Sequence, residues 1–127
     1  MLTIMVVHHD PERRESLSFL LRHSGFRIVA ASDGEQALAE IDGSPPDLIV
    51  MAQSNGRLSG GELCARIRGL CRTPILVLGR EREEVAGIDW LEAGADAYLT
   101  SPLNLRELLA RVRSLLRRAR ADAMEPA

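Results

Sequence analysis

The sequence has 127 residues, which is the length of one compact domain. Hydrophobic residues make up 46% of the chain, which argues against a disordered protein. No apolar run approaches the roughly 20 residues that a membrane-spanning helix needs, and the net charge of −2 excludes a domain that binds polyanions as a whole. We therefore expect a globular, cytoplasmic domain without membrane contact.

The chain begins with a strand-like segment that leads into a helix. Leu2–Val7 is rich in branched apolar residues, which favour a β-strand. Asp10 is placed to cap the N-terminus of the next helix, with Pro11 in the first turn, where proline is tolerated. The helix is predicted to end near His23, because Gly25 suits the position just beyond a helix C-terminus.

A second strand and helix follow, and then a fully apolar strand. Arg27–Ala31 is predicted to be a short strand. Ser32 and Glu35 have the spacing of a capping box, which predicts that a helix begins there. The helix ends before Pro45-Pro46, and the continuous apolar run Leu48–Ala52 predicts the third strand.

The second half of the chain repeats the same alternation. Apolar residues at helical spacing in Leu63–Leu70 predict the third helix, and Ile75–Leu78 predicts the fourth strand. A fourth helix is expected over Val85–Leu91, followed by a fifth strand at Tyr98–Thr100.

The last helix has the clearest pattern. Asn104 and Glu107 form a second capping-box pattern, and an apolar stripe from Leu105 to Leu116 predicts a strongly amphipathic helix. We expect the domain to occupy residues 1–120 and residues 121–127 to be a C-terminal tail or a truncated linker.

Strict alternation of strands and helices determines the expected fold class. Apolar strands separated by helices predict an α/β domain with one parallel sheet that is covered on both faces. Right-handed crossovers make such a sheet doubly wound. Its working site lies at the carboxyl ends of the strands, which here are His8-His9, Ala52, Gly79 and Ser101.

Three stretches of the sequence resemble the receiver domain of two-component response regulators, in particular the winged-helix (OmpR/PhoB-like) branch. They are Val6–Glu12, Pro46–Val50 and Leu91–Pro102, of which the last is the most specific. The similarity runs from Leu2 to Arg118 without gaps and so covers nearly the whole chain. It implies a five-stranded, flavodoxin-like (βα)5 topology for the doubly wound sheet.

The resemblance also implies a chemistry that this sequence has lost. The family transfers a phosphoryl group to an aspartate, but Ala52 stands at that nucleophile position. The acidic pair that should hold Mg²⁺ falls on His8 and His9. The hydroxyl and the lysine that should bind the phosphoryl oxygens fall on Gly79 and Ser101, and the chain has no lysine. We therefore predict a degenerate phosphorylation site, no catalytic residue and no enzyme.

The degenerate site leaves several alternatives open. Tyr98 keeps the aromatic residue of the family's switch position. His8 and His9 could bind a transition metal, although no third ligand has a suitable spacing, and they could also titrate near neutral pH. A small organic ligand could fill the space left at Ala52 and Gly79. We predict no bound metal and no cofactor.

The resemblance places a partner-binding face on the fourth helix, the fifth strand and the fifth helix. Trp90, the only tryptophan, is a candidate anchor for a partner. The winged-helix branch dimerises through ion pairs, of which Glu92 with Arg113 remains, because partners of the other pairs fall on Gly87 and Ala97. The candidate interface residues are Ile88, Trp90, Glu92, Glu107, Leu109, Arg111 and Arg113.

The function predicted from these residues is that of a phosphorylation-independent receiver domain. It would act as a protein–protein interaction or dimerisation module in signal transduction or transcription regulation. The alternative is a domain that senses a small molecule in the vacated phosphorylation site. We expect DNA contact only through an effector domain outside these residues, although the six arginines between Leu103 and Arg120 could also meet phosphates.

Overall fold

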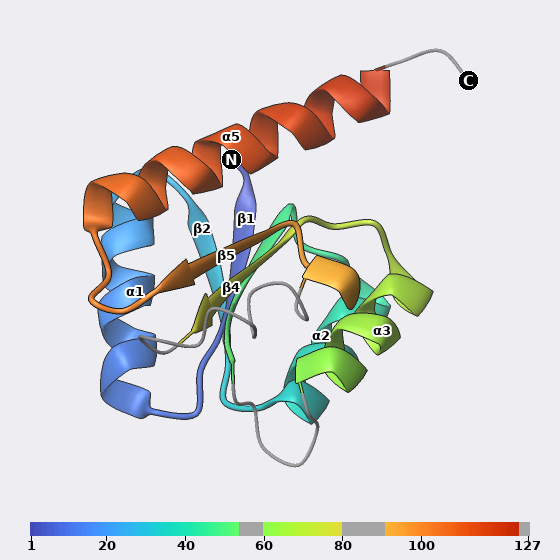
Figure 1. Cartoon of the computed structure of the whole chain (residues 1–127), viewed down its shortest axis with the longest axis horizontal. Coiled ribbons are helices and arrows are strands. Elements are labelled where there is room, and N and C mark those ends of the chain that lie inside the picture. Colours follow the sequence, from blue (N-terminus) through green and yellow to red (C-terminus); the bar gives the residue numbers. More distant parts are fainter. Residues whose placement is uncertain (54–59, 80–90, 125–127) are drawn as a thin grey trace.

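A computed structural model describes residues 1–53, 60–79 and 91–124. Its five-stranded parallel sheet has the order β2-β1-β3-β4-β5 and carries helices on both faces (Figure 1). The strands are β1 (Thr3–Val7), β2 (Arg27–Ala31), β3 (Leu48–Ala52), β4 (Ile75–Gly79) and β5 (Ala97–Thr100). The helices are α1 (Pro11–His23), α2 (Gly34–Gly43), α3 (Gly60–Leu70) and α5 (Leu105–Met124). The predicted α/β class and doubly wound topology are confirmed.

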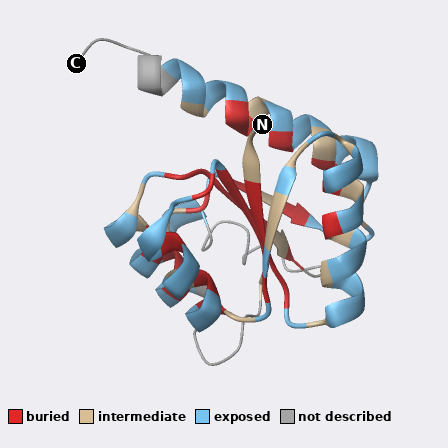
Figure 2. Ribbon diagram, turned by 180° about the vertical axis from the view of Figure 1, so that it is seen from behind, coloured by how far each residue is buried: buried red, intermediate tan, exposed pale blue. Residues whose placement is uncertain are grey.

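Two apolar cores lie on opposite faces of the sheet. Helices α1 and α5 cover one face, where Leu21, Leu108 and Val112 pack against Ile4 and Val50. Helices α2 and α3 cover the other face, and their apolar side chains pack against the alternate residues of the strands. Figure 2 shows that the buried residues concentrate in the central strands and on the helix sides that face them. Strand β3 is buried at all five positions because it lies in the middle of the sheet.

Local sequence signals explain the ends of α1. The Asp10 carboxylate accepts a hydrogen bond from the Glu12 backbone N–H at 3.0 Å, and Pro11 occupies the first turn, as predicted. The helix ends at His23, and Gly25 adopts a φ of 99°, a left-handed conformation that favours glycine.

The start of α2 differs by one residue from the prediction. Asp33, not Ser32, is the N-cap, and its side chain accepts from the Gln36 backbone N–H at 2.8 Å. The Gln36 side chain accepts in turn from both the backbone N–H and the hydroxyl of Ser32. The predicted pairing of Ser32 with Glu35 was therefore wrong, because neighbouring Asp33 and Gln36 offer the same cap chemistry one residue later.

The C-terminal helix is longer than its apolar stripe. Asn104 accepts from the backbone N–H groups of Arg106 and Glu107, so the predicted cap at Asn104 is confirmed. The helix continues to Met124, and so residues 121–124, which were expected in the tail, are helical. Most of the fourth helix expected over Val85–Leu91 lies outside the described residues. Among the helices that the structure describes, none combines the length and hydrophobicity needed to cross a membrane.

The amino ends of the strands are joined by side chains. The Asp96 carboxylate accepts from the Ile75 backbone N–H at 2.8 Å and pairs with the Arg68 guanidinium at 2.7 Å. Arg68 also donates to the carbonyl oxygens of Thr73 and Gly94. This network ties α3 to the starts of β4 and β5. It also gives Gly94 and Asp96, within the stretch Leu91–Pro102, a structural role.

Candidate functional site

The carboxyl ends of the strands bring the residues predicted to form a degenerate phosphorylation site to one edge of the sheet. Val7 of β1 pairs with Met51 of β3, which places the following residues, His8 and Ala52, side by side. On the other side of β3, Ala52 itself pairs with Leu78, the residue before Gly79. The sequence positions identified through the resemblance therefore lie at one end of adjacent strands.

His8 is held in one orientation by short contacts. Its ring Nδ1 accepts from the Asp10 backbone N–H at 3.0 Å, and its carbonyl oxygen accepts from the Arg14 guanidinium at 2.9 Å. The side chain is buried, and burial lowers the pKa of His8, with a further lowering from the charge of His9 and an opposing effect of Asp10. An Nδ1 that accepts a hydrogen bond belongs to a neutral ring, so contacts and burial both favour uncharged His8.

His9 and Asp10 do not complete a metal site with His8. The rings of His8 and His9 stack with centroids 5.1 Å apart, and His9 is exposed. Asp10 is engaged as the cap of α1 and pairs with Arg13 at 3.7 Å. In the parts of the chain that the structure describes, three or more residues of His, Cys, Asp or Glu never come together in a group that could hold a metal ion.

Tyr98 occupies the space beside Gly79. A Cβ atom added to Gly79 would overlap the Tyr98 hydroxyl and ring, with its Cε2 atom at 2.6 Å. The hydroxyl of Tyr98 donates to the Gln53 side-chain oxygen at 3.2 Å. Tyr98 pairs with Val77 across β4 and β5, and Gly79 is the next residue on the same face of β4. The ring can lie over the end of β4 because residue 79 has no side chain.

Gln53 is a site residue that the sequence reasoning missed. It follows Ala52, and its backbone N–H donates to the Leu78 carbonyl at 3.0 Å, which continues the ladder between β3 and β4. The amide side chain can therefore reach across β4 to Tyr98. Its place directly after Ala52 is a signal that could have singled it out.

Ala52 and Ser101 offer no nucleophile of the expected kind. Ala52 is buried and its methyl group cannot attack phosphorus, while Ser101 is exposed and its backbone N–H donates to the Gly79 carbonyl at 3.3 Å. Elsewhere, burial raises the pKa of the Cys64 thiol to about 11, which keeps that cysteine protonated and unreactive.

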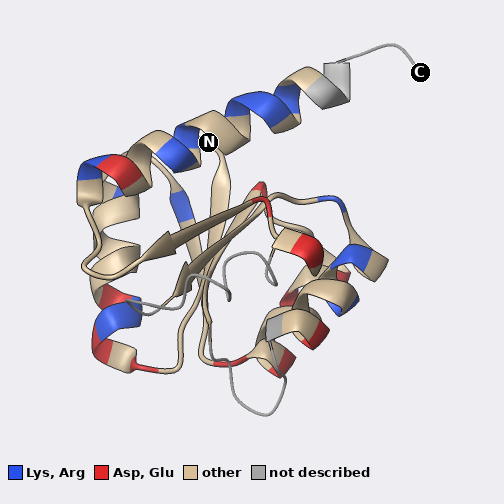
Figure 3. Ribbon diagram, in the orientation of Figure 1, with Lys and Arg blue, Asp and Glu red and all other residues tan. Residues whose placement is uncertain are grey.

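The predicted partner face is described only in part. Ile88, Trp90 and Gly87 lie outside the described residues. Leu109 is half-buried against the core, and Ala97 is buried within it. The charged candidates are all exposed, and they are Glu92, Glu107, Arg111 and Arg113. Figure 3 shows arginines along α5.

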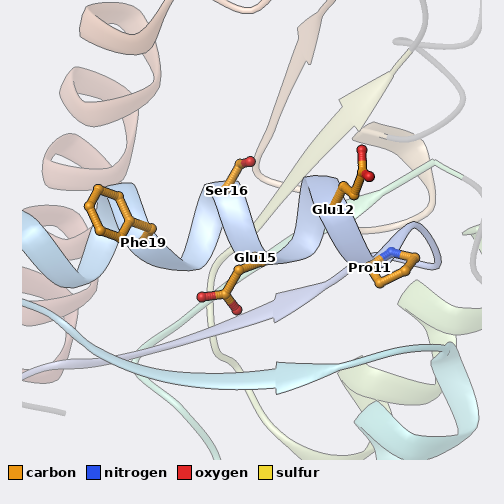
Figure 4. A pocket seen from close by; sticks show the side chains of 5 residues that line it. All are labelled: Pro11, Glu12, Glu15, Ser16 and Phe19. Carbon is orange, nitrogen blue, oxygen red and sulfur yellow. The ribbon is translucent and has the colours of Figure 1, made fainter.

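A shallow hollow on α1 is separate from this edge. It is lined by Pro11, Glu12, Glu15, Ser16 and Phe19, all from one helix (Figure 4). Among the described residues no second element closes it, and none of the carboxyl-edge positions contributes to it. Its geometry is that of an open helix surface and not of an enclosed ligand site.

Comparisons with known proteins agree with this geometry. A model of the response regulator receiver domain family matches residues 4–113. The sensory transduction protein RegX3 of Mycobacterium bovis is 34% identical over 125 residues, which are 98% of this chain and 55% of RegX3. The response regulator MprA of Mycobacterium tuberculosis is 44% identical over 123 residues, which are 94% of this chain and 52% of MprA.

Further relatives extend the same pattern. The alkaline phosphatase synthesis transcriptional regulatory protein PhoP of Bacillus subtilis is 39% identical over 121 residues, 94% of this chain and 50% of PhoP. The chain spans about half the length of these relatives. A two-component response regulator from Clostridium difficile has a solved structure that matches with a TM-score of 0.87 at 30% identity, covering 93% of this chain and 98% of that one.

Proposed function

Because the chain belongs to the family of response regulator receiver domains, which are signalling domains and not enzymes, we propose that it signals without being phosphorylated. It would work as a protein–protein interaction or dimerisation module of a two-component system. The relatives' names speak of response and transcriptional regulation. An effector domain outside these residues would then carry the regulatory output.

The observation that carries this proposal is the position of the Tyr98 ring. In a receiver domain the end of β4 must present a hydroxyl to the phosphoryl group. Here residue 79 is a glycine, and the ring beside it is bonded to Gln53. Tyr98 can hold this position without a phosphoryl group, because its hydrogen-bond partner is a side chain of the same protein.

The remaining residues of the edge support the same proposal. Mg²⁺ prefers oxygen ligands, whereas His8 and His9 offer ring nitrogens, and the His8 Nδ1 atom is already engaged with the Asp10 backbone. Ala52 supplies no nucleophile. A small molecule in the vacated site would compete with Tyr98 for the space beside Gly79, so the contact module is favoured over the ligand sensor.

Sedimentation velocity of the chain tests this function, with and without Mg²⁺ and the phosphoryl mimic beryllofluoride. We expect the same mass distribution in both conditions, because the site offers neither a Mg²⁺ cage nor an aspartate at the nucleophile position, where Ala52 stands. Intact-mass spectrometry after incubation with acetyl phosphate should likewise show no added phosphoryl group. A change of assembly with the mimic, or a phosphorylated chain, would show that a working phosphoryl site exists.

A charge exchange tests the predicted dimer face. Glu92→Arg should weaken a symmetric dimer by repulsion from Arg113 of the other copy, and adding Arg113→Glu should restore it. Exposed pairs contribute about 0–1 kcal/mol each, so the dimer dissociation constant should change by a few-fold. A double variant as weak as the single one would exclude this pair from the interface.

A further inference from the structure

Charge is separated along this chain. Residues 105–120 of α5 carry six arginines and one glutamate, a net charge of +5, whereas residues 1–104 carry ten arginines and fifteen acidic residues, a net charge of −5. Figure 3 shows the arginines following α5, while acidic residues gather at the start of α1 and on α2, toward the other end of the domain. One helix therefore presents a positive surface on a molecule that is negative overall.

Four of these arginines form a straight stripe. With 3.6 residues per turn, Arg106, Arg113, Arg117 and Arg120 fall within an arc of about 60° and extend over roughly 21 Å of the helix. All four side chains are exposed. No other residue between Arg106 and Arg120 falls within this arc; Ala110 lies about 20° beyond one edge and half-buried Leu109 about 20° beyond the other, while the buried apolar side chains of α5 face the core. We call these four residues the arginine stripe.

The stripe has no counter-charge within the described residues. The ion pairs found there join Arg13 to Asp10 and Arg68 to Asp96, and no α5 guanidinium makes a hydrogen bond there. Like charges three or four residues apart on a helix destabilise it by about 0.2–0.5 kcal/mol per pair. Arg113, Arg117 and Arg120 have this spacing. The stripe therefore lowers the stability of α5 slightly. A contribution to helix stability does not explain why these arginines are there.

We propose that the arginine stripe binds the phosphate backbone of double-stranded DNA. The planar guanidinium fork suits phosphate oxygens, and a row of such groups can follow a charged backbone. Residues 105–124 contain no Asn or Gln side chain to read adenine, and α5 lies with its apolar face packed on the sheet, which favours contact of its arginines with the backbone over insertion of the helix into a groove. The contact should therefore be independent of base sequence and sensitive to salt.

The same features disfavour other partners. Protein interfaces depend on aromatic or large apolar anchors. One side of the stripe is flanked by Ala110 and Ala121, and on the other side Leu109 is half-buried and Leu116 buried against the core. A membrane-surface helix must bury an apolar face in lipid, whereas the apolar face of α5 already packs on the sheet. DNA needs neither kind of anchor, because phosphate contacts and the release of counterions supply the affinity.

Fluorescence anisotropy with labelled DNA duplexes of about 20 base pairs, at about 50–200 mM salt, tests this proposal. Three to four phosphate contacts predict a slope of about −3 in a plot of log K against log salt. Arg117→Gln/Arg120→Gln should reduce the slope by about 2 units and weaken binding by on the order of tenfold at low salt. Both residues lie outside the predicted dimer interface, so the dimer face stays intact.

Arg66→Gln/Arg72→Gln is the matched control, because both side chains are exposed and the loss of charge is the same. This variant should bind DNA as the unchanged chain does, and far-UV circular dichroism should show both variants folded. Equal weakening by both pairs would reduce the effect to net charge and overturn the proposal. Equal competition by poly-glutamate would also overturn it, because it would show a general polyanion surface. A slope near zero in the plot of log K against log salt would overturn it as well.

Discussion

The two edges of the parallel sheet use their polar side chains differently. At the amino edge, polar groups join residues far apart in the sequence: Arg68 to Asp96 and Thr73 to Pro46, at separations of 28 and 27 residues. At the carboxyl edge, His8 and Asp10 bond within two residues of each other. The contact of Tyr98 with Gln53 at this edge also spans a long separation, 45 residues.

This difference distinguishes the edge that ties the strands together from the edge that carries the proposed degenerate site. The amino edge keeps buried or half-buried groups whose loss would leave backbone atoms of neighbouring strands unpaired. The carboxyl edge carries His8, Ala52 and Gly79 where the proposed function assigns a degenerate phosphorylation site, and the five-stranded sheet forms with these residues in place. Under the proposed function the sheet does not need phosphorylation chemistry, because contacts at the amino edge support it separately.

The largest expected effect on stability comes from removing Arg68 at the amino edge. In Arg68→Ala, the carbonyl oxygens of Thr73 and Gly94 lose their donor, and Asp96 loses its ion pair. We expect a loss of about 2–3 kcal/mol in the free energy of unfolding, measured by urea denaturation. Arg72→Ala, an exposed arginine close by, should change stability by less than about 0.5 kcal/mol. Equal losses would mean that the network contributes little beyond its charge.

Adding a methyl group at Gly79 should have a smaller, local effect. The new Cβ of Gly79→Ala would overlap Tyr98, so that the ring must leave its place beside β4 or strain its neighbours. Overpacking of this kind costs about 1–3 kcal/mol. In a Tyr98→Leu background the same substitution should cost less, because the overlapping hydroxyl and ring are gone. A double-mutant cycle of unfolding free energies measures this coupling, and simple additivity would contradict the contact.

The sequence predicts the framework of this molecule better than its long-range contacts. The strand Leu48–Ala52 was predicted with the bounds that the structure shows, because a continuous apolar run between turn signals leaves few alternatives. The cap of α2 was misplaced by one residue, since Ser32 and Asp33 are both suitable caps. Local patterns identify an element well and its first residue less well.

The contacts of the site depend on register, which local patterns do not contain. The carboxyl-edge positions followed from the strand ends and the resemblance, and the structure brings them to one edge. The contact of Tyr98 with Gly79 needs the alignment of β4 with β5. Gln53 carries no motif, and Arg68 with Asp96 is a pair without periodic spacing.

The smallest expected effect is a pH dependence of stability that comes from His8. Burial lowers the pKa of folded His8 below the ordinary value of 6.5. The charges of His9, Arg13 and Arg14 lower it further, whereas the charge of Asp10 raises it. As pH falls through 6.5 the unfolded chain takes up this proton before the folded chain does, so stability decreases until the folded pKa is passed. Urea unfolding between about pH 7 and 5 measures this slope.

Substitution separates His8 from the other titrating groups. His8→Asn removes the titrating ring and keeps a side-chain oxygen that can accept from the Asp10 N–H, so the slope should become shallower. A slope as steep in His8→Asn as in the unchanged chain would show that the pH dependence comes from other groups. The carboxyl edge would then have no proton-linked residue of its own.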